Sequence, residues 1–103
     1  LIFDEIDSGV GGAVADAIGH RLARLAEHIQ VLAVTHAPQV AARAHTHYLI
    51  AKSGHDRVTT GVTVMDAAAR QEEIARMLAG ATITDEARAA AQRLLSGSTV
   101  MAG

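Results

Sequence analysis

Three side chains able to do chemistry follow two apolar segments of this chain. Asp4 and Glu5 come directly after residues 1–3, and His36 comes directly after residues 31–35. The carboxyl ends of neighbouring parallel strands meet at one edge of a sheet, so we expect these side chains to lie close together. One carboxylate can hold a metal, the second can orient water, and the histidine can contact a phosphate. The pattern predicts half of a nucleotide-hydrolysing site.

Alternating strand and helix patterns are expected to position these side chains. The continuous apolar runs at 1–4 and 31–35 predict strands that are buried on both faces. The segment between them predicts a helix over 13–28, because apolar residues recur there at spacings of three and four. These are Val14, Ile18, Leu22, Leu25 and Ile29.

The remainder of the chain predicts a β-hairpin followed by helices. Pro38 suits the first turn of a short helix through residue 44, since its missing N–H is not needed there. The hairpin is expected from strands at 47–52 and 57–65 with a turn at 53–56. Asp66 and Thr84 can each begin a helix, and Gly80 can end the first of them. The second helix is expected to end near Ser96-Gly97.

These elements together indicate an α/β fold. Residues 1–97 are expected to form one lobe, and residues 98–103 a flexible tail. At 103 residues the chain can hold one modest core, made of Ala, Val, Leu and Ile because only Phe3 and Tyr48 are aromatic. Since the chain opens without Met and inside a strand pattern, we expect it to be a piece of a longer protein.

Composition excludes several classes of function. The net charge is −2 and no basic run is present, so the chain offers no electrostatic surface for a nucleic-acid backbone. It has no cysteine, which excludes disulfides and thiolate metal sites and fits a cytosolic origin. No apolar run approaches the ~18–20 residues needed to span a bilayer, so no membrane partner is expected.

Two further patterns resemble binding sites. His45 and His47 alternate and could share a metal, but with no third ligand nearby a solvated pair is the better interpretation. The glycines at 9–12 suggest a dinucleotide-binding loop, but the third glycine of that fingerprint would fall at Val14. A phosphate-binding loop with Lys is also missing, because Lys52 is the only lysine. We therefore expect no ATP hydrolysis from this chain alone.

Three separated segments carry a family resemblance. Residues 1–5 resemble the Walker B strand of an ABC-type ATPase head, residues 6–12 resemble its D-loop, and His36 falls where that family has its switch histidine. The sequences DSGVGG, THAPQVAA and EIARMLAG, in this order, resemble the C-terminal end of bacterial RecN, an SMC-like ATPase family of DNA double-strand break repair. This resemblance implies the C-terminal part of a P-loop NTPase head of the ABC/SMC type.

The resemblance also implies roles for individual residues. Asp4 would help to hold Mg²⁺, directly or through water, and Glu5 would activate the hydrolytic water. His36 would contact the γ-phosphate of ATP, and Gln39 would support that loop. The D-loop residues, which are Asp7, Ser8 and Gly9, would lie at the interface between two ATP sites.

The implied partners are a second ATPase head, bound as a homodimer through the D-loop, the N-terminal half of the same head, and DNA. The implied location is the bacterial cytoplasm, at the nucleoid. Two alternatives remain at this point. One is a non-catalytic α/β interaction module, which the missing phosphate loop favours. The other is an ABC transporter ATPase fragment, which Ile6-Asp7 argues against because transporter subunits usually have Pro-Thr there.

Overall fold

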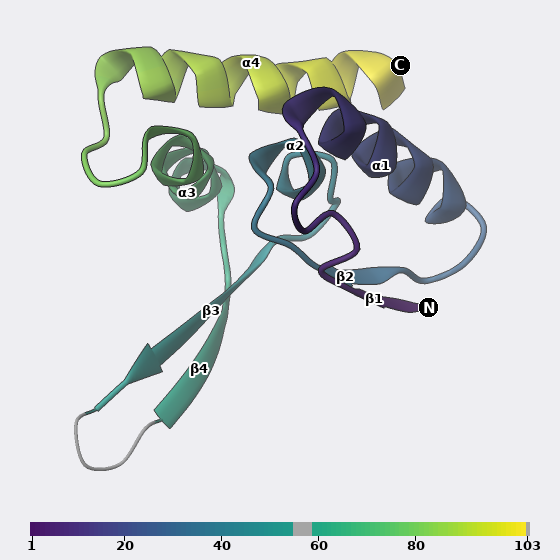
Figure 1. The fold of residues 1–103 in the computed structure, drawn as a ribbon, viewed down its shortest axis with the longest axis horizontal. Coiled ribbons are helices and arrows are strands. Elements are labelled where there is room, and N and C mark those ends of the chain that lie inside the picture. Colours follow the sequence, from purple (N-terminus) through teal and green to yellow (C-terminus); the bar gives the residue numbers. More distant parts are fainter. Residues whose placement is uncertain (55–58, 103) are drawn as a thin grey trace.

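A computed structural model of the chain describes residues 1–54 and 59–102. Strands and helices alternate, and then a hairpin and two helices follow, so the predicted α/β fold is confirmed (Figure 1). The elements are, in order, β1 (Ile2–Asp4), α1 (Gly12–Leu25), β2 (Leu32–Val34), α2 (Pro38–Ala41), β3 (Tyr48–Ser53), β4 (Thr59–Val64), α3 (Ala67–Ala79) and α4 (Asp85–Ala102).

Strands β1 and β2 form a two-stranded parallel sheet, in which Phe3 pairs with Ala33 and Asp4 with Val34. The prediction that these strands are buried on both faces is wrong within this chain. Ile2 is 75% exposed and Leu32 is 50% exposed. A continuous apolar run indicates that a strand can be covered on both faces, whereas the cover itself must come from other segments.

Helix α1 packs against α2 through small residues rather than through its predicted apolar positions. Ala15 and Gly19 are its buried residues, whereas Val14 is 52% exposed. A Cβ on Gly19 would lie 2.9 Å from the backbone oxygen of Gln39 and 3.3 Å from the Cα of Val40. The two backbones approach each other at Gly19 more closely than any side chain there would allow.

Strands β3 and β4 form an antiparallel hairpin that projects away from the helices (Figure 1). The predicted turn at 53–56 lies partly outside the described residues, since 55–58 are not described. Tyr48 pairs with Val64 and Ile50 with Val62. All four of these side chains are about half exposed or more. The hairpin therefore presents an uncovered apolar face within the part of the chain that the structure describes.

Helices α3 and α4 pack together and hold the core of the described residues. Ile74, Ala75 and Ala91 are 0% exposed, and Ala42, which directly follows α2, is 1% exposed. Apolar burial is the main favourable term in folding, so the burial of this cluster stabilises the packing of α2, α3 and α4. The site-bearing segments after β1 and β2 are connected to it through α2.

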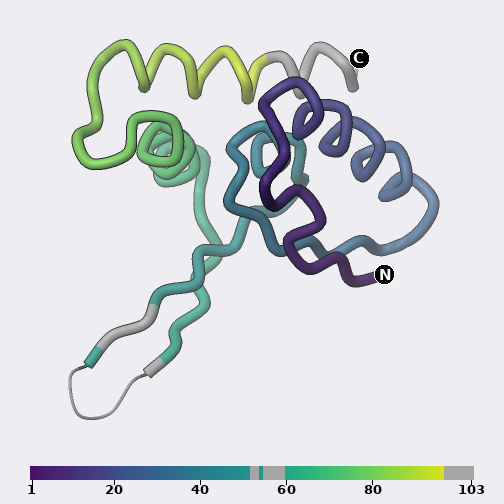
Figure 2. Tube along the Cα trace, in the orientation of Figure 1, coloured from purple at the N-terminus to yellow at the C-terminus, as the bar shows by residue number. Residues whose placement is uncertain are grey.

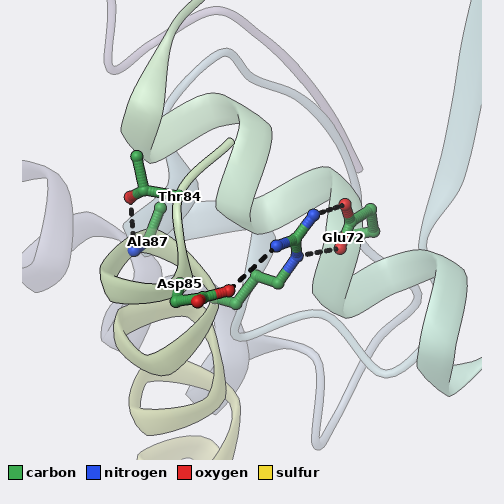
Figure 3. Close-up of polar contacts among 5 residues, drawn as sticks. Glu72, Thr84, Asp85 and Ala87 are labelled. Carbon is green, nitrogen blue, oxygen red and sulfur yellow. Dashed lines mark hydrogen bonds and ion pairs between the residues drawn. The ribbon is translucent and has the colours of Figure 1, made fainter. Parts of the chain in front are cut away.

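The ends of α3 and α4 confirm the predicted caps. The Asp66 carboxylate accepts a hydrogen bond from the backbone N–H of Ala69 at 2.8 Å, and Gly80 ends α3 with a φ of 80°. The Thr84 hydroxyl accepts from the Ala87 N–H at 3.1 Å (Figure 3). Arg88 of α4 bridges to Glu72 of α3 and to Asp85, which ties the two helices together at their surface (Figure 3).

The predicted end of the last helix near Ser96-Gly97 is wrong, because α4 continues to Ala102. A glycine inside a helix costs about 1 kcal/mol relative to alanine, but it ends a helix only where the backbone turns left-handed. Gly97 therefore permits the helix to continue. The flexibility expected of residues 98–103 stays a prediction.

Candidate functional site

The parallel pairing of β1 and β2 brings the predicted site residues to one edge of the sheet. The Glu5 N–H donates to the Val34 carbonyl at 2.8 Å, which extends the ladder one residue past β1. The loop after β1 thus runs beside the segment after β2 (Figure 2). At this edge the His36 Nε2 lies 2.7 Å from the Glu5 Oε1. Residues 31 positions apart in sequence therefore form one polar pair.

The Glu5–His36 pair is open to solvent. The His36 side chain is 87% exposed and that of Glu5 is 45% exposed. Asp4, at the end of β1, is also exposed. An exposed ion pair contributes little to stability, typically about 0–1 kcal/mol. The arrangement leaves both side chains accessible to a ligand that reaches the sheet edge.

The backbone of Glu5 is in the left-handed region, with a φ of 51°. It is the only non-glycine residue with a positive φ in the described part of the chain. This conformation costs roughly 1–2 kcal/mol for a residue with a Cβ. The turn that follows is closed by a hydrogen bond from the Ser8 N–H to the Glu5 carbonyl at 3.1 Å. Strain of this kind is often found at functional sites, because it aims a side chain that a relaxed backbone would turn away.

Asp7 points into its own chain. It is 7% exposed, and its carboxylate accepts a hydrogen bond from the Thr35 hydroxyl. The Thr35 Oγ1 in turn accepts from the Ala37 N–H at 2.9 Å. These bonds fix the two residues that flank His36. The sequence did not single out Thr35, although a hydroxyl residue directly before a strand-end histidine was a signal for such hydrogen bonds.

The other predicted loop residues lie around this centre. Ser8 and Gly9 are exposed, and Gly9 has a φ of 78°. Gln39 is partly buried, and its Nε2 lies 3.3 Å from where a Cβ on Gly12 would be, at the start of α1. The side-chain amide of Gln39 therefore lies close to Gly12, where the loop after β1 ends. The roles predicted for Asp7, Ser8, Gly9 and Gln39 stay predictions.

The described residues contain no group of three or more His, Cys, Asp or Glu side chains that could hold a metal. The role predicted for Asp4 stays a prediction. Mg²⁺ commonly takes one or two protein carboxylates and completes its octahedron with water and substrate phosphates.

His47 is not the solvated residue that the sequence analysis expected. Its Nδ1 is buried without a hydrogen-bond partner in the structure, whereas His45 is exposed. Burial, and to a smaller extent the charge of Arg70, lowers the pKa of His47, and Glu73 partly offsets this effect. His47 is therefore partly buried near Arg70 and Glu73 of α3, and the solvated-pair interpretation is wrong for it.

Comparison with curated proteins supports the family resemblance, although no protein-family model matches the chain. The chain is 54% identical over 96 residues to DNA repair protein RecN of Xylella fastidiosa (strain Temecula1), covering 92% of the chain and 17% of that protein. It is 50% identical to the RecN protein of Mycobacterium tuberculosis (strain H37Rv) over 92% of the chain and 16% of that protein. The resemblance to RecN is confirmed.

The similarity to RecN extends over nearly the whole chain and does not depend on one short motif. The RecN protein of Deinococcus radiodurans is 48% identical over 94% of the chain. The chain spans about one sixth of the length of the RecN proteins that it matches. None of the helices described here has the length and hydrophobicity to cross a membrane.

Proposed function

We propose that this chain is part of the ATPase head of an SMC-like, RecN-type protein of DNA double-strand break repair and recombination. The curated relatives carry the name DNA repair protein RecN, which supports the repair role. The contact between Glu5 and His36, at 2.7 Å across neighbouring strands, is the observation that supports ATP hydrolysis most directly. In this proposal the chain contributes the side of the ATP site that activates water.

Glu5 is the proposed general base. Its Oε1 faces His36, so the Oε2 atom can accept a proton from a water molecule at the sheet edge. Glu5 directly follows β1, and its backbone is left-handed, with a φ of 51°. A general base must lie within hydrogen-bond reach of the attacking water, and its 45% exposure leaves room for that water.

His36 is the proposed contact for the γ-phosphate of ATP. Its side chain is 87% exposed, and its backbone is fixed by the hydrogen bonds of Thr35 and Ala37. A phosphate oxygen that approaches Nε2 would compete with the Glu5 carboxylate for it. The arrival of nucleotide would then release Glu5 to the water, which would link substrate binding to activation of the base.

The remaining parts of the site follow from the same proposal. Asp4 would hold Mg²⁺, directly or through water, and the ion would neutralise charge on the phosphates. Gln39 would support the His36 loop from α2. The phosphate loop would come from the N-terminal half of the same head, and the exposed Ser8 and Gly9 would meet a second head. The whole protein would act on DNA at the nucleoid in the bacterial cytoplasm.

The experiment uses a chimaera in which this chain replaces the matching segment of Xylella fastidiosa RecN, to which it is 54% identical. Glu5→Gln should still bind ATP, because the amide keeps the shape of the side chain, but should slow hydrolysis about 10²–10⁴-fold. Glu27→Gln, at an exposed position after α1, is the matched control and should hydrolyse at the unsubstituted rate. ATP turnover and binding of a fluorescent ATP analogue are measured in parallel.

Each result has a definite meaning. Near-normal turnover in Glu5→Gln would remove Glu5 from the mechanism. An unsubstituted chimaera that binds no nucleotide, beside an active Xylella fastidiosa protein, would favour the non-catalytic interaction module.

A further inference from the structure

We propose that Arg70 is a positioning residue for His36, acting through the single helical turn of α2. The proposal rests on the function proposed above, because the position of His36 matters for hydrolysis only if His36 contacts the nucleotide. Arg70 lies in the first turns of α3, outside the candidate site. It reaches the site only through the backbone of α2.

The Arg70 guanidinium caps the carboxyl end of α2. Its Nη2 donates to the carbonyl oxygens of Ala41 at 3.0 Å, Ala42 at 3.1 Å and Ala44 at 2.5 Å. The last carbonyls of a helix have no partner within the helix, and a cation is favoured at that end by the helix dipole. Arg70 therefore adds a charged donor to the last carbonyl of α2, which also accepts from the Ala44 N–H at 3.2 Å, and to two carbonyls of the turn that follows. Its Nε is buried without a partner among the described residues.

Helix α2 depends on such an anchor because it has four residues. Forming one turn fixes several backbone angles for very few hydrogen bonds, so an isolated turn is unstable. Val40 and Ala41 are each 6% exposed, which shows that the turn is held by its surroundings. Arg70 supplies the polar part of that support.

The anchor is continuous with the His36 loop. The Ala37 carbonyl accepts from the Ala41 N–H at 3.1 Å, and the Ala37 N–H donates to the Thr35 Oγ1 at 2.9 Å. His36 lies between the two residues joined by this second bond. A shift of α2 would therefore move the backbone that carries His36 relative to Glu5. Misplacement of a catalytic group by about 1 Å can cost on the order of 100-fold in rate.

The test compares Arg70→Met with Arg76→Met. Arg76 lies on the same helix, is exposed, and pairs with Glu73 at the surface, so it controls for the loss of an arginine from α3. In the chimaera, Arg70→Met should lower kcat per folded molecule about 10- to 100-fold and leave the KM for ATP within about twofold. Arg76→Met should change neither. A purely structural role would lower the folded fraction but leave kcat per folded molecule unchanged.

A second readout does not require hydrolysis. In the 103-residue chain labelled with ¹⁵N in its histidine rings, Arg70→Met should shift the NMR signals of the His36 ring, and Arg76→Met should not. His36 signals and kcat per folded molecule that match those of the unsubstituted protein would overturn the proposal. If Glu5→Gln hydrolyses normally, the proposed function fails, and the NMR result still decides whether Arg70 positions His36.

Arg70→Lys is the second variant, for the case in which Arg70→Met does not fold. Lysine keeps the charge at the end of α2, but its side chain is shorter, so its Nζ cannot reach the position of the single Nη2 that contacts all three carbonyls. We expect a folded protein with shifted His36 signals and a smaller loss of kcat. Unshifted His36 signals in this variant would overturn the proposal.

Discussion

At the scale of single residues, the buried Asp7 is the most informative side chain of the candidate site. The family resemblance implied that it meets a second ATPase head, whereas the structure shows its carboxylate bonded to Thr35 of its own chain. In the proposed head, its 7% exposure would leave contact with a second head mainly to Ser8 and Gly9. Asp7 would then link the D-loop to the His36 loop within one head.

Thr35→Val should test that link, because valine keeps the shape but removes the hydroxyl donor. A buried carboxylate left without its partner costs about 1–3 kcal/mol, so the free energy of unfolding should fall by that amount. Thr35→Ser keeps the hydroxyl and should retain most of the stability. Urea unfolding of the chain measures both variants, and equal stability of the Val and Ser forms would contradict the link.

His47 should make the stability of the chain depend on pH. Burial lowers its pKa in the folded state below the ordinary value of 6.5, so the unfolded chain binds the proton more tightly. The free energy of unfolding should be highest above pH 6.5 and should fall as the pH drops below it. His47→Gln should remove this contribution to the pH dependence below pH 6.5. Urea unfolding at a series of pH values measures it, and an unchanged slope in the Gln variant would exclude His47 as its cause.

At the scale of elements, the contact between α1 and α2 is set by backbone proximity. The hydrophobic pattern predicted that Val14 and Ile29 face the core, but both are about half exposed. The buried positions are Ala15 and Gly19 instead. Small residues on α1 allow α2, and with it the His36 loop, to lie close to the helix.

Gly19→Ala should therefore destabilise the chain, although alanine is the better helix former. The new Cβ would lie 2.9 Å from the Gln39 backbone oxygen, which cannot move without moving α2. Overpacking costs about 1–3 kcal/mol and helix propensity returns about 1 kcal/mol, so we expect a net loss on the order of 1 kcal/mol.

Gly12→Ala is the matched control. Its Cβ would meet only the movable end of the Gln39 side chain, at 3.3 Å. Thermal unfolding of both variants decides the question, and a Gly19→Ala protein more stable than Gly12→Ala would contradict the close contact.

At the scale of the whole molecule, two apolar surfaces lie uncovered within the described residues. One is formed by Ile2 and Leu32 on the β1–β2 sheet, and the other by the hairpin residues Tyr48, Ile50, Val62 and Val64. Exposed apolar surfaces of this kind mark interaction sites or cause self-association. In the proposed head, other parts of the same protein would cover them.

The 103-residue chain alone should therefore self-associate as its concentration rises. Burying one large apolar side chain contributes about 1.5–3 kcal/mol, so a few of them suffice for a weak dimer. Replacing Ile50 and Val62 together by Thr keeps the β propensity of the hairpin and should shift the chain toward monomer. Sedimentation analysis measures the change, and a double variant that associates as strongly as the unsubstituted chain would place the contact elsewhere.

The sequence by itself determined the local features of this protein. The caps at Asp66 and Thr84, the stop at Gly80 and the helix start at Pro38 depend on neighbouring backbone groups, so their residue types predicted them. The meeting of Glu5 and His36 was also predictable, because it follows from parallel strand pairing.

Only the tertiary structure decided the other contacts between distant residues. Three contacts each join segments more than 20 residues apart. They are the hydrogen bond between Asp7 and Thr35, the partial burial of His47 near Arg70, and the capping of α2 by Arg70. No local pattern encodes such a contact, because its free energy depends on both segments being placed by the rest of the fold. The exposure of β1 and β2 has the same cause, because the side chains that bury an apolar strand must come from other segments.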